Sequence, residues 1–468
     1  MEVQTLLFGE NPPVLNPKTL FLKNHEPTKA SQKKCGVIKS YAANTNQGII
    51  RDYNEDRVSI ILNILKPKSK QHLNIEWPQI CFFGVFDGHG GAACADYLRD
   101  NLHNFVVQNE HFPQFPQEAI VAGFKECERS FINLVEVAQS RAQNAMPGQQ
   151  VGPERSGSCA TVVMIIDDMA YVINVGDSRC LMSIDAGTQI AVLTRDHKPD
   201  DEQERIRIQA AGGKIYRTQT FAKAATSPEE KDLYVQGPLR VFPGRLSVSR
   251  TFGDIEAKRQ KYGGNPNVIV CDPEIKSFKL QNNFDFFLIG CDGIFERLEN
   301  KHIIDSVWNR IDEQITSKTP DNLSPNYNPA RLGPKGKVGG SRAQQTFHYD
   351  EHIAAAEGVE IALRQAAASR SLDNITVLIL GLKNLKQTIK KMNDGQTLQA
   401  VRQQNISDAR HMKHTYERDF EYLEVNEHDL NLLSDNDVNS ANDSLEADAT
   451  CTVEEDKNKK NSKSVASP

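Results

Sequence analysis

Short apolar runs separated by polar turns dominate the chain from Gly36 onward. Two of these runs, CATVVMII and MAYVINV, meet at Asp167-Asp168. Runs of roughly four to eight β-branched and aromatic residues bounded by turn formers are typical of β-strands, so this junction predicts a hairpin. Further strands are predicted at VIKSYA, DRVSIILNI, QICFFGVF, TQIAVLTRD, DFFLIGCDG and NITVLILGL.

Longer segments with apolar residues at steps of three and four predict helices that pack by one face. The clearest covers residues 116–140, and two others are HIIDSVWNRIDEQI and EHIAAAEGVEIALRQAAAS. Another helix is predicted over residues 200–211, with Asp200 as its N-terminal cap and Gly212-Gly213 as its stop. The helices come in pairs between blocks of strands, which favours antiparallel sheets covered by helices over a doubly wound parallel sheet.

The polar segments divide the chain into a core and its extensions. Residues 1–35 carry prolines and lysines without periodicity and predict a flexible leader, whereas 36–383 has the texture of one globular domain. Within that domain, residues 317–347 contain four prolines and predict a surface insertion. Residues 384–468 are polar and acidic, which predicts a largely disordered tail.

Composition narrows the class of protein. No apolar run approaches the roughly 18 residues of a membrane span, and the N-terminus lacks the order of a signal peptide. The nine cysteines include no CxxC pair, which favours reduced, buried thiols. We therefore expect an intracellular monomer of the cytoplasm or nucleus that binds no nucleic acid. Because the net charge of −6 is concentrated in the tail, the remainder is mildly basic and suits anionic substrates.

The strongest chemical signal is a set of acidic residues at the ends of apolar strands. Asp87 and Asp292 each follow a strand and precede a glycine, and Asp373 directly precedes a strand. Carboxylates are seldom buried unless they are paired or bind a metal. Any one of them could be a turn former, but their recurrence predicts a site for a hard cation, which prefers oxygen ligands.

The loop GVFDGHGGAACA allows a second interpretation. Gly88-x-Gly90-x-x-Ala93 matches the glycine pattern of a dinucleotide-binding turn. However, Asp87 would repel a pyrophosphate, and no acidic residue follows at about 20 positions to hold a ribose. The pattern therefore favours a metal-binding loop.

Eight motifs in a fixed order carry a family resemblance. They are RDYNEDR, VFDGHGG, SGSCATVV, NVGDSRC, LTRDHKP, RLSVSRTFGD, IGCDGIFE and LDNITV. In this order the chain resembles the metal-dependent protein phosphatase 2C family over residues 36–383. The resemblance implies an α+β fold of two antiparallel β-sheets packed as a central sandwich, with antiparallel helix pairs on both outer faces. It also implies hydrolysis of phosphoserine and phosphothreonine in proteins with two Mg²⁺ or Mn²⁺ ions, and a variable flap at residues 214–250.

The resemblance also implies the metal ligands. Asp87 is expected to bridge both ions, and Gly88 to offer its backbone carbonyl to one of them. Asp292 and Asp373 are expected to bind the other ion, and Asp56 to hold a water on the metals. Two ions of this kind activate a bridging water and neutralise the charge of a phosphate monoester, which water alone attacks very slowly.

Further roles are implied for the residues around the metals. Arg51 is expected to grip the phosphate through its planar guanidinium, and His89 to protonate the leaving oxygen. Glu55 is expected to support the metal ligands. Asp177 and Glu296 match positions where the family can hold a third, weaker ion, although the family usually has Asp where this chain has Glu296.

Two other functions remain open at this point. A member that has lost its metal carboxylates would be a non-catalytic scaffold, but Asp87, Asp292 and Asp373 are all present. A phosphatase of small phosphoesters is the weaker alternative. We expect phosphorylated proteins as substrates.

Overall fold

Two antiparallel β-sheets form the centre of the molecule. The computed structural model describes residues 22, 24–143, 154–223, 233–317 and 349–412. The first sheet has the strand order β1 (Lys29–Ala30), β2 (Ser40–Asn46), β16 (Ile375–Gly381), β15 (Phe284–Gly290), β9 (Arg179–Ile184) and β10 (Gln189–Val192). The second has the order β14 (Glu274–Lys279), β8 (Met169–Val175), β7 (Ala160–Ile166), β4 (Ile80–Phe86) and β3 (Arg57–Leu62). β7 and β8 form the hairpin predicted at Asp167-Asp168.

Side chains that alternate along β4 show why the sheets pack face to face. Ile80, Phe82 and Phe86 belong to the core beneath one helix pair. Phe83 points to the other face, where its ring centroid lies 6.2 Å from that of Tyr41 on β2 of the opposite sheet. Every β4 residue is buried, because one face of the strand lies on a helix layer and the other lies between the two sheets. This position explains why the strand is a continuous apolar run.

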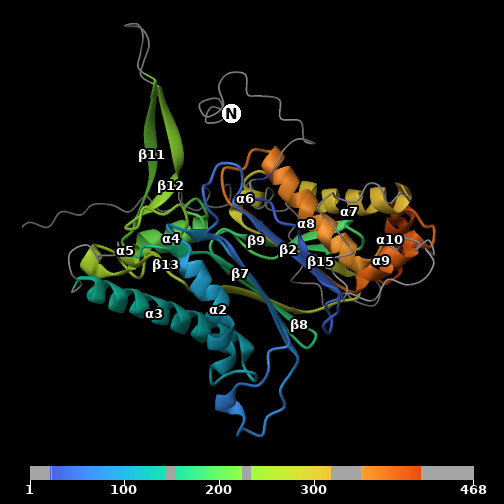
Figure 1. Cartoon of the computed structure of the whole chain (residues 1–468), viewed down its shortest axis with the longest axis horizontal. Helices are drawn as coiled ribbons and strands as arrows, with labels where there is room; N and C mark the ends of the chain where they lie inside the picture. Colours follow the sequence, from blue (N-terminus) through green and yellow to red (C-terminus); the bar gives the residue numbers. More distant parts are fainter. Residues whose placement is uncertain (1–21, 23, 144–153, 224–232, 318–348, 413–468) are drawn as a thin grey trace, which may run out of the picture. The chain divides into compact units, whose positions relative to one another are not determined.

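Helix pairs cover the outer faces of both sheets (Figure 1). α2 (Ala93–Gln108) and α3 (Pro116–Gln143) lie against the second sheet, and α7 (Asn300–Ser317) and α8 (Glu351–Ala368) against the first. α3 includes the predicted helix at 116–140. The predicted α+β sandwich with helices on both outer faces is therefore confirmed.

Several shorter elements lie between the main strands and helices. β5 (Gly88–His89), β6 (Gly157–Ser158) and β13 (Phe252–Gly253) form a small antiparallel sheet. α5 (Ile255–Lys258) and the 3-10 helix η2 (Gln260–Tyr262) follow β13, and α6 (Asp292–Phe295) follows β15. A further 3-10 helix, η1 (Lys68–Lys70), lies between β3 and β4.

The expected flap contains a long hairpin. β11 (Lys214–Lys223) and β12 (Leu233–Phe242) form a two-stranded sheet that projects from the body (Figure 1). The preceding helix, α4 (Glu202–Ala210), corrects one prediction, because its N-terminal cap is Asp201 and not Asp200. The Asp201 side chain accepts from the backbone N–H of Glu204, and its extended backbone suits the cap position.

The compact part extends beyond the predicted boundaries at both ends. In the expected leader, β1 pairs with β2, and Thr28 Oγ1 donates to Glu360 Oε1 of α8 at 2.5 Å. In the expected tail, α9 (Lys383–Asn393) and α10 (Leu398–Met412) contribute buried apolar side chains to the first-sheet core. These are Leu385, Ile389, Met392, Leu398 and Val401. The apolar spacing of LKQTIKKM is amphipathic, which explains why this basic stretch packs.

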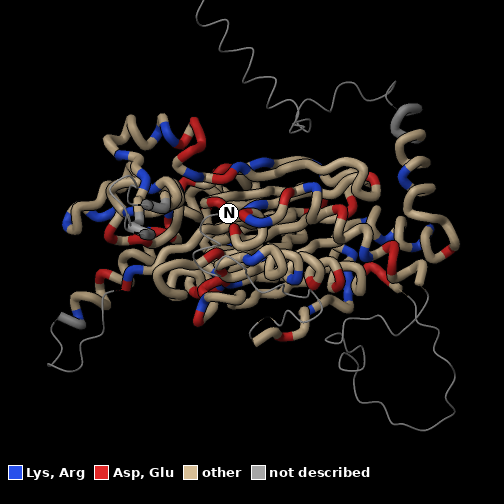
Figure 2. Tube along the Cα trace, turned by 90° about the horizontal axis from the view of Figure 1, so that it is seen from above, with Lys and Arg blue, Asp and Glu red and all other residues tan. Residues whose placement is uncertain are grey.

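Two other sequence predictions concern the surface insertion at residues 317–347 and membrane spans. The predicted insertion lies outside the described residues except for Ser317, which ends α7. Among the described helices, none combines the length and apolar character that crossing a membrane requires. Basic and acidic side chains are interspersed along the described trace (Figure 2).

Candidate metal and phosphate site

The predicted carboxylates converge where the ends of the two sheets meet. Asp87 follows β4 of the second sheet, and Asp292 begins α6 just after β15 of the first. Oxygen atoms of these two carboxylates and Sγ of Cys291 all lie within 4.8 Å of one another. Asp87 Oδ2 accepts from Ser178 Oγ at 3.3 Å and from the backbone N–H of Asp292 at 3.4 Å. Two segments about 200 positions apart thus share one hydrogen-bonded cluster.

The electrostatics of this cluster fit a hard cation. Burial raises the pKa of Asp87 well above its usual value, and the nearby carboxylates of Asp292 and Asp56 raise it further. Burial also raises the pKa of Asp292, with Asp177 and Asp373 adding to the effect. Several carboxylates held this close repel one another when ionised. A divalent cation removes that repulsion and takes oxygen ligands, so the carboxylates suit a hard divalent ion.

Asp56 and Gly88 line the same cluster. Asp56 is buried and accepts from Thr376 Oγ1 at 2.6 Å, and burial raises its pKa to about 7. Gly88 leaves no room for a side chain, because a Cβ there would lie 2.4 Å from the backbone oxygen of Glu55. This close approach explains the glycine after Asp87.

Glu55 holds the loop that follows Asp87. Its Oε1 accepts from the backbone N–H of Gly91 at 2.5 Å, while its own N–H donates to Asn374 Oδ1 at 2.9 Å. Asn374 also donates to the backbone oxygens of Gln47 and Tyr53, both at 3.0 Å. Glu55 therefore supports the loop through these two bonds. Sequence reasoning missed Asn374, although it stands in the LDNITV motif.

Arg51 lies against Asp373, one of the predicted metal ligands. Its Nη2 donates to Asp373 Oδ2 at 2.6 Å, and its Nε to the backbone oxygen of Leu372 at 3.4 Å. Burial would lower the pKa of Arg51, but Asp373 outweighs that effect and raises it. Nearly half of the Arg51 side chain is exposed, at 46%. Its guanidinium is thus held beside the carboxylates and stays open to an anionic solute.

His89 is joined to an aspartate that the sequence analysis did not assign. His89 Nε2 lies 2.8 Å from Asp254 Oδ2. β6 bridges the two residues, because it pairs with β5, which holds His89, and with β13, which precedes Asp254. Burial alone would lower the pKa of His89, but the Asp254 carboxylate and its hydrogen bond raise it. The signal for Asp254 was present in the motif RLSVSRTFGD.

Gly157 on β6 makes the contact between His89 and Asp254 possible. A Cβ at this position would lie 2.0 Å from Asp254 Oδ2 and 2.4 Å from His89 Nε2. Any side chain would therefore displace one of the two groups. The glycine of SGSCATVV is explained by this close approach.

Asp177 and Glu296, the residues of the expected third site, both face Lys198. The Nζ of Lys198 lies 3.5 Å from Asp177 Oδ2 and 3.7 Å from Glu296 Oε1. Cys159 Sγ donates to the other oxygen of Asp177 at 3.4 Å. Lys198 belongs to the motif LTRDHKP but was not assigned a role from sequence.

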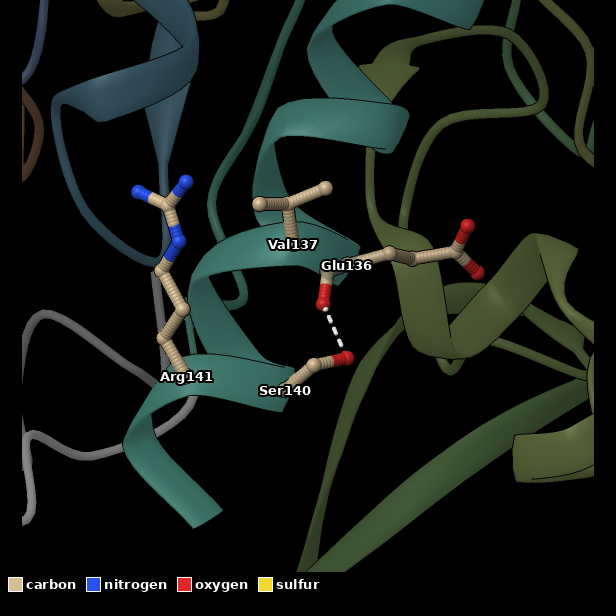
Figure 3. Close-up of a pocket in the computed structure, with 4 residues that line it drawn as sticks. All are labelled: Glu136, Val137, Ser140 and Arg141. Atoms are coloured by element: carbon tan, nitrogen blue, oxygen red, sulfur yellow. Dashed lines mark hydrogen bonds between the residues drawn. The ribbon is translucent and has the colours of Figure 1, made fainter. Parts of the chain in front are cut away.

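A pocket of about 290 Å³ lies elsewhere, on the C-terminal part of α3. Figure 3 shows its lining residues, Glu136, Val137, Ser140 and Arg141, with the bond from Ser140 Oγ to the Glu136 backbone oxygen. It contains none of the predicted site residues and only one carboxylate. The cluster at the sheet ends is therefore the better candidate for the chemistry.

Comparisons with known proteins agree with the motifs. The family model for "Protein phosphatase 2C" matches residues 53–327, more than half of the chain. "Probable protein phosphatase 2C 57" of Oryza sativa subsp. japonica is 29% identical over 52% of this chain and 60% of its own length. "Probable protein phosphatase 2C 11" of Arabidopsis thaliana is 30% identical over 58% of this chain. The chain spans 57% of that second relative, so both alignments cover less than two thirds of the relatives' lengths.

Among solved structures, a serine-threonine phosphatase 2C from Toxoplasma gondii matches 77% of this chain and 100% of its own. Its TM-score is 0.46 and its sequence identity is 17%.

Proposed function

This chain belongs to the protein phosphatase 2C family, and from that premise we propose that it is a metal-dependent protein serine/threonine phosphatase. Its substrates are then proteins that carry phosphoserine or phosphothreonine. The observation that carries the proposal is the cluster of Asp87, Asp292 and neighbouring carboxylates, flanked by Arg51 and by the pair of His89 and Asp254.

The metals belong at the carboxylate cluster. Two Mg²⁺ or Mn²⁺ ions would be held by Asp87, the Gly88 carbonyl, Asp292 and Asp373, with Asp56 beside them. When bound, they would neutralise the phosphate dianion and lower the pKa of the attacking water. Hydrogen bonds from Ser178 and from the Asp292 backbone to one oxygen of Asp87 orient its carboxylate. Glu55 fixes the loop through Gly91 and so keeps Gly88 in position.

Arg51 binds the phosphate in this proposal. A planar guanidinium can donate two parallel hydrogen bonds to phosphate oxygens, which both attracts and orients the group. Asp373 and the Leu372 carbonyl hold Nη2 and Nε of Arg51, so the head of the side chain is oriented before substrate arrives. Less conformational freedom is then lost on binding.

His89 supplies the proton that an alkoxide leaving group needs. Asp254 faces Nε2 and favours the protonated ring, which leaves Nδ1 to donate to the departing serine or threonine oxygen. General acids of this kind typically accelerate a reaction by about 10²–10⁴-fold. Asp254 acts through His89 and is a positioning residue.

The experiment is phosphate release from a phosphothreonine peptide with and without Mn²⁺. We expect release that requires the metal and is lost in Asp87→Asn, while a variant of the exposed Asp100 on α2, Asp100→Asn, retains it. Release from p-nitrophenyl phosphate alone would favour a phosphatase of small phosphoesters. A folded protein without release from either substrate at saturating Mn²⁺ would favour the scaffold alternative.

A further inference from the structure

One lysine stands between the two carboxylates at which a third ion was expected. Lys198 Nζ lies within 4.0 Å of both Asp177 and Glu296, at 3.5 Å and 3.7 Å. Only about a quarter of the Lys198 side chain is exposed, at 27%, and Asp177 is buried. The ammonium is therefore a largely enclosed counterion for these two carboxylates.

The backbone around Lys198 fixes it in this position. Its N–H donates to the Asp196 oxygen at 3.0 Å, and its own oxygen accepts from Asp201 at 3.1 Å. The preceding residue, His197, is fully buried and makes two hydrogen bonds with Gly176. The His197 N–H donates to the Gly176 oxygen at 2.9 Å, and His197 Nδ1 accepts from the Gly176 N–H at 3.1 Å. Because Gly176 precedes Asp177, the lysine loop and the carboxylate turn are tied together.

Two of the carboxylates around Lys198 have further hydrogen-bond partners. Asp177 Oδ1 accepts from Cys159, and both oxygens of Asp196 accept from Arg179, at 3.1 Å and 2.9 Å. Mg²⁺ takes near-octahedral oxygen coordination at about 2.0–2.1 Å and usually keeps several waters, so the charge next to its one or two carboxylates decides whether it binds. A divalent ion between Asp177 and Glu296 would also meet an ammonium within a few ångströms, which repels it. The surroundings suit one monovalent organic cation and do not suit a divalent ion.

We propose that the Lys198 ammonium occupies the third cation position, so that this chain binds two divalent ions and not three. The inference rests on the two-ion site proposed above. It also accounts for Glu296, since a side chain longer than Asp reaches Lys198 from the C-terminal end of α6. The carboxylates around Lys198 outweigh its burial and raise its pKa, so it remains charged.

Counting bound Mn²⁺ tests the inference without measuring activity. Equilibrium dialysis, with free Mn²⁺ followed by electron paramagnetic resonance, should give two ions for the wild-type chain. Lys198→Met removes the charge and keeps an apolar stem, and it should bind a third ion that is lost again in Lys198→Met/Asp177→Asn. Lys125→Met, which removes the exposed partner of Asp272, is the matched control and should bind two ions.

Glu296→Gln separates the alternatives even if Lys198→Met does not fold. Glu296 is half exposed, at 52%, so its amide is tolerated. The inference expects two ions in both the wild-type chain and Glu296→Gln. Three ions in the wild type, falling to two in Glu296→Gln, would overturn it, as would a folded Lys198→Met that binds only two. A wild-type chain that binds no Mn²⁺, or an Asp87→Asn variant with an unchanged count, would instead contradict the two-ion site itself.

Discussion

Replacing Asp254 with Asn tests whether this carboxylate sets the protonation of His89. The amide keeps the size of the side chain and a hydrogen-bonding oxygen, but it removes the negative charge 2.8 Å from Nε2. A hydrogen bond to a charged group contributes about 1.5–3 kcal/mol, and one pKa unit corresponds to about 1.4 kcal/mol. Because a third of the His89 side chain is exposed, solvent screening places the loss at the lower end of that range of about 1.5–3 kcal/mol.

The sign of the expected shift follows from the role of the ring. Asp254 raises the pKa of His89, so the protonated form persists to higher pH in the wild-type enzyme. Removing the charge lowers that pKa, and the alkaline limb of kcat/KM should move to lower pH. Activity below the new pKa should change little, since His89 remains protonated there.

The assay compares two leaving groups across pH. A phosphothreonine peptide releases an alkoxide that needs a proton, whereas p-nitrophenyl phosphate releases a stable phenolate. Above the pKa of His89 in the variant, the loss in Asp254→Asn should therefore be large with the peptide and small with the aryl phosphate. His89→Gln should show the same contrast with a greater loss, and at lower pH as well. Asp272→Asn, at an exposed pair with Lys125, is the control and should leave both pH profiles unchanged. Equal losses on both substrates with an unmoved alkaline limb would mean that Asp254 only shapes the loop.

Three further predictions concern the site and the chain ends. Asp87→Asn should abolish metal-dependent turnover. The melting temperature without metal should stay equal or rise, because the substitution neutralises one of several carboxylates that repel one another. Near wild-type turnover at saturating Mn²⁺ would contradict this prediction. Arg51→Ala should weaken phosphate binding by about 1.5–3 kcal/mol, and Arg51→Lys should restore only part of it, as measured by inhibition by free phosphate. Truncation after residue 416 should preserve stability and activity. Truncation after residue 382 should lower the free energy of unfolding, because each apolar side chain buried by α9 and α10 contributes about 1.5–3 kcal/mol. Equal denaturation midpoints of the two truncated chains would contradict this prediction.

The sequence predicted those parts of the fold that depend on the pattern of neighbouring residues. The hairpin at Asp167-Asp168 and the helix at 116–140 follow from alternation and from steps of three and four, which are properties of neighbouring residues. The convergence of Asp87 and Asp292 could also be inferred, because both end buried strands. The cap of α4 shifted from Asp200 to Asp201 because two adjacent aspartates are equivalent in sequence, and the turn that begins at Lys198 selects between them.

The parts that sequence missed depend on contacts between distant segments. Asp254 is 165 positions from His89, and the small sheet of β5, β6 and β13 brings them together. Lys198 reaches Asp177 because the buried His197 binds Gly176, a pairing with no periodic signal. The predicted tail boundary did not take into account that the apolar face of α9 packs on the first-sheet core. The basic composition of this segment concealed that face.

The apolar cores stabilise the sandwich and the carboxylate cluster at its edge destabilises it, which explains how the fold can hold carboxylates that repel one another. Asp87 comes from the second sheet, while Asp292 and Asp373 come from the first, so the cluster forms only when the two sheets pack. Burial and mutual repulsion raise the pKa values of Asp87 and Asp292, which means that the ionised cluster lowers stability. The opposing contribution comes from the apolar cores under both helix layers and from contacts such as Phe83 with Tyr41 between the sheets. Cations that bind only the folded chain add to that contribution in proportion to the logarithm of their concentration. Substitutions in the cores should therefore change the stability without metal, whereas substitutions in the cluster should change how strongly stability depends on metal.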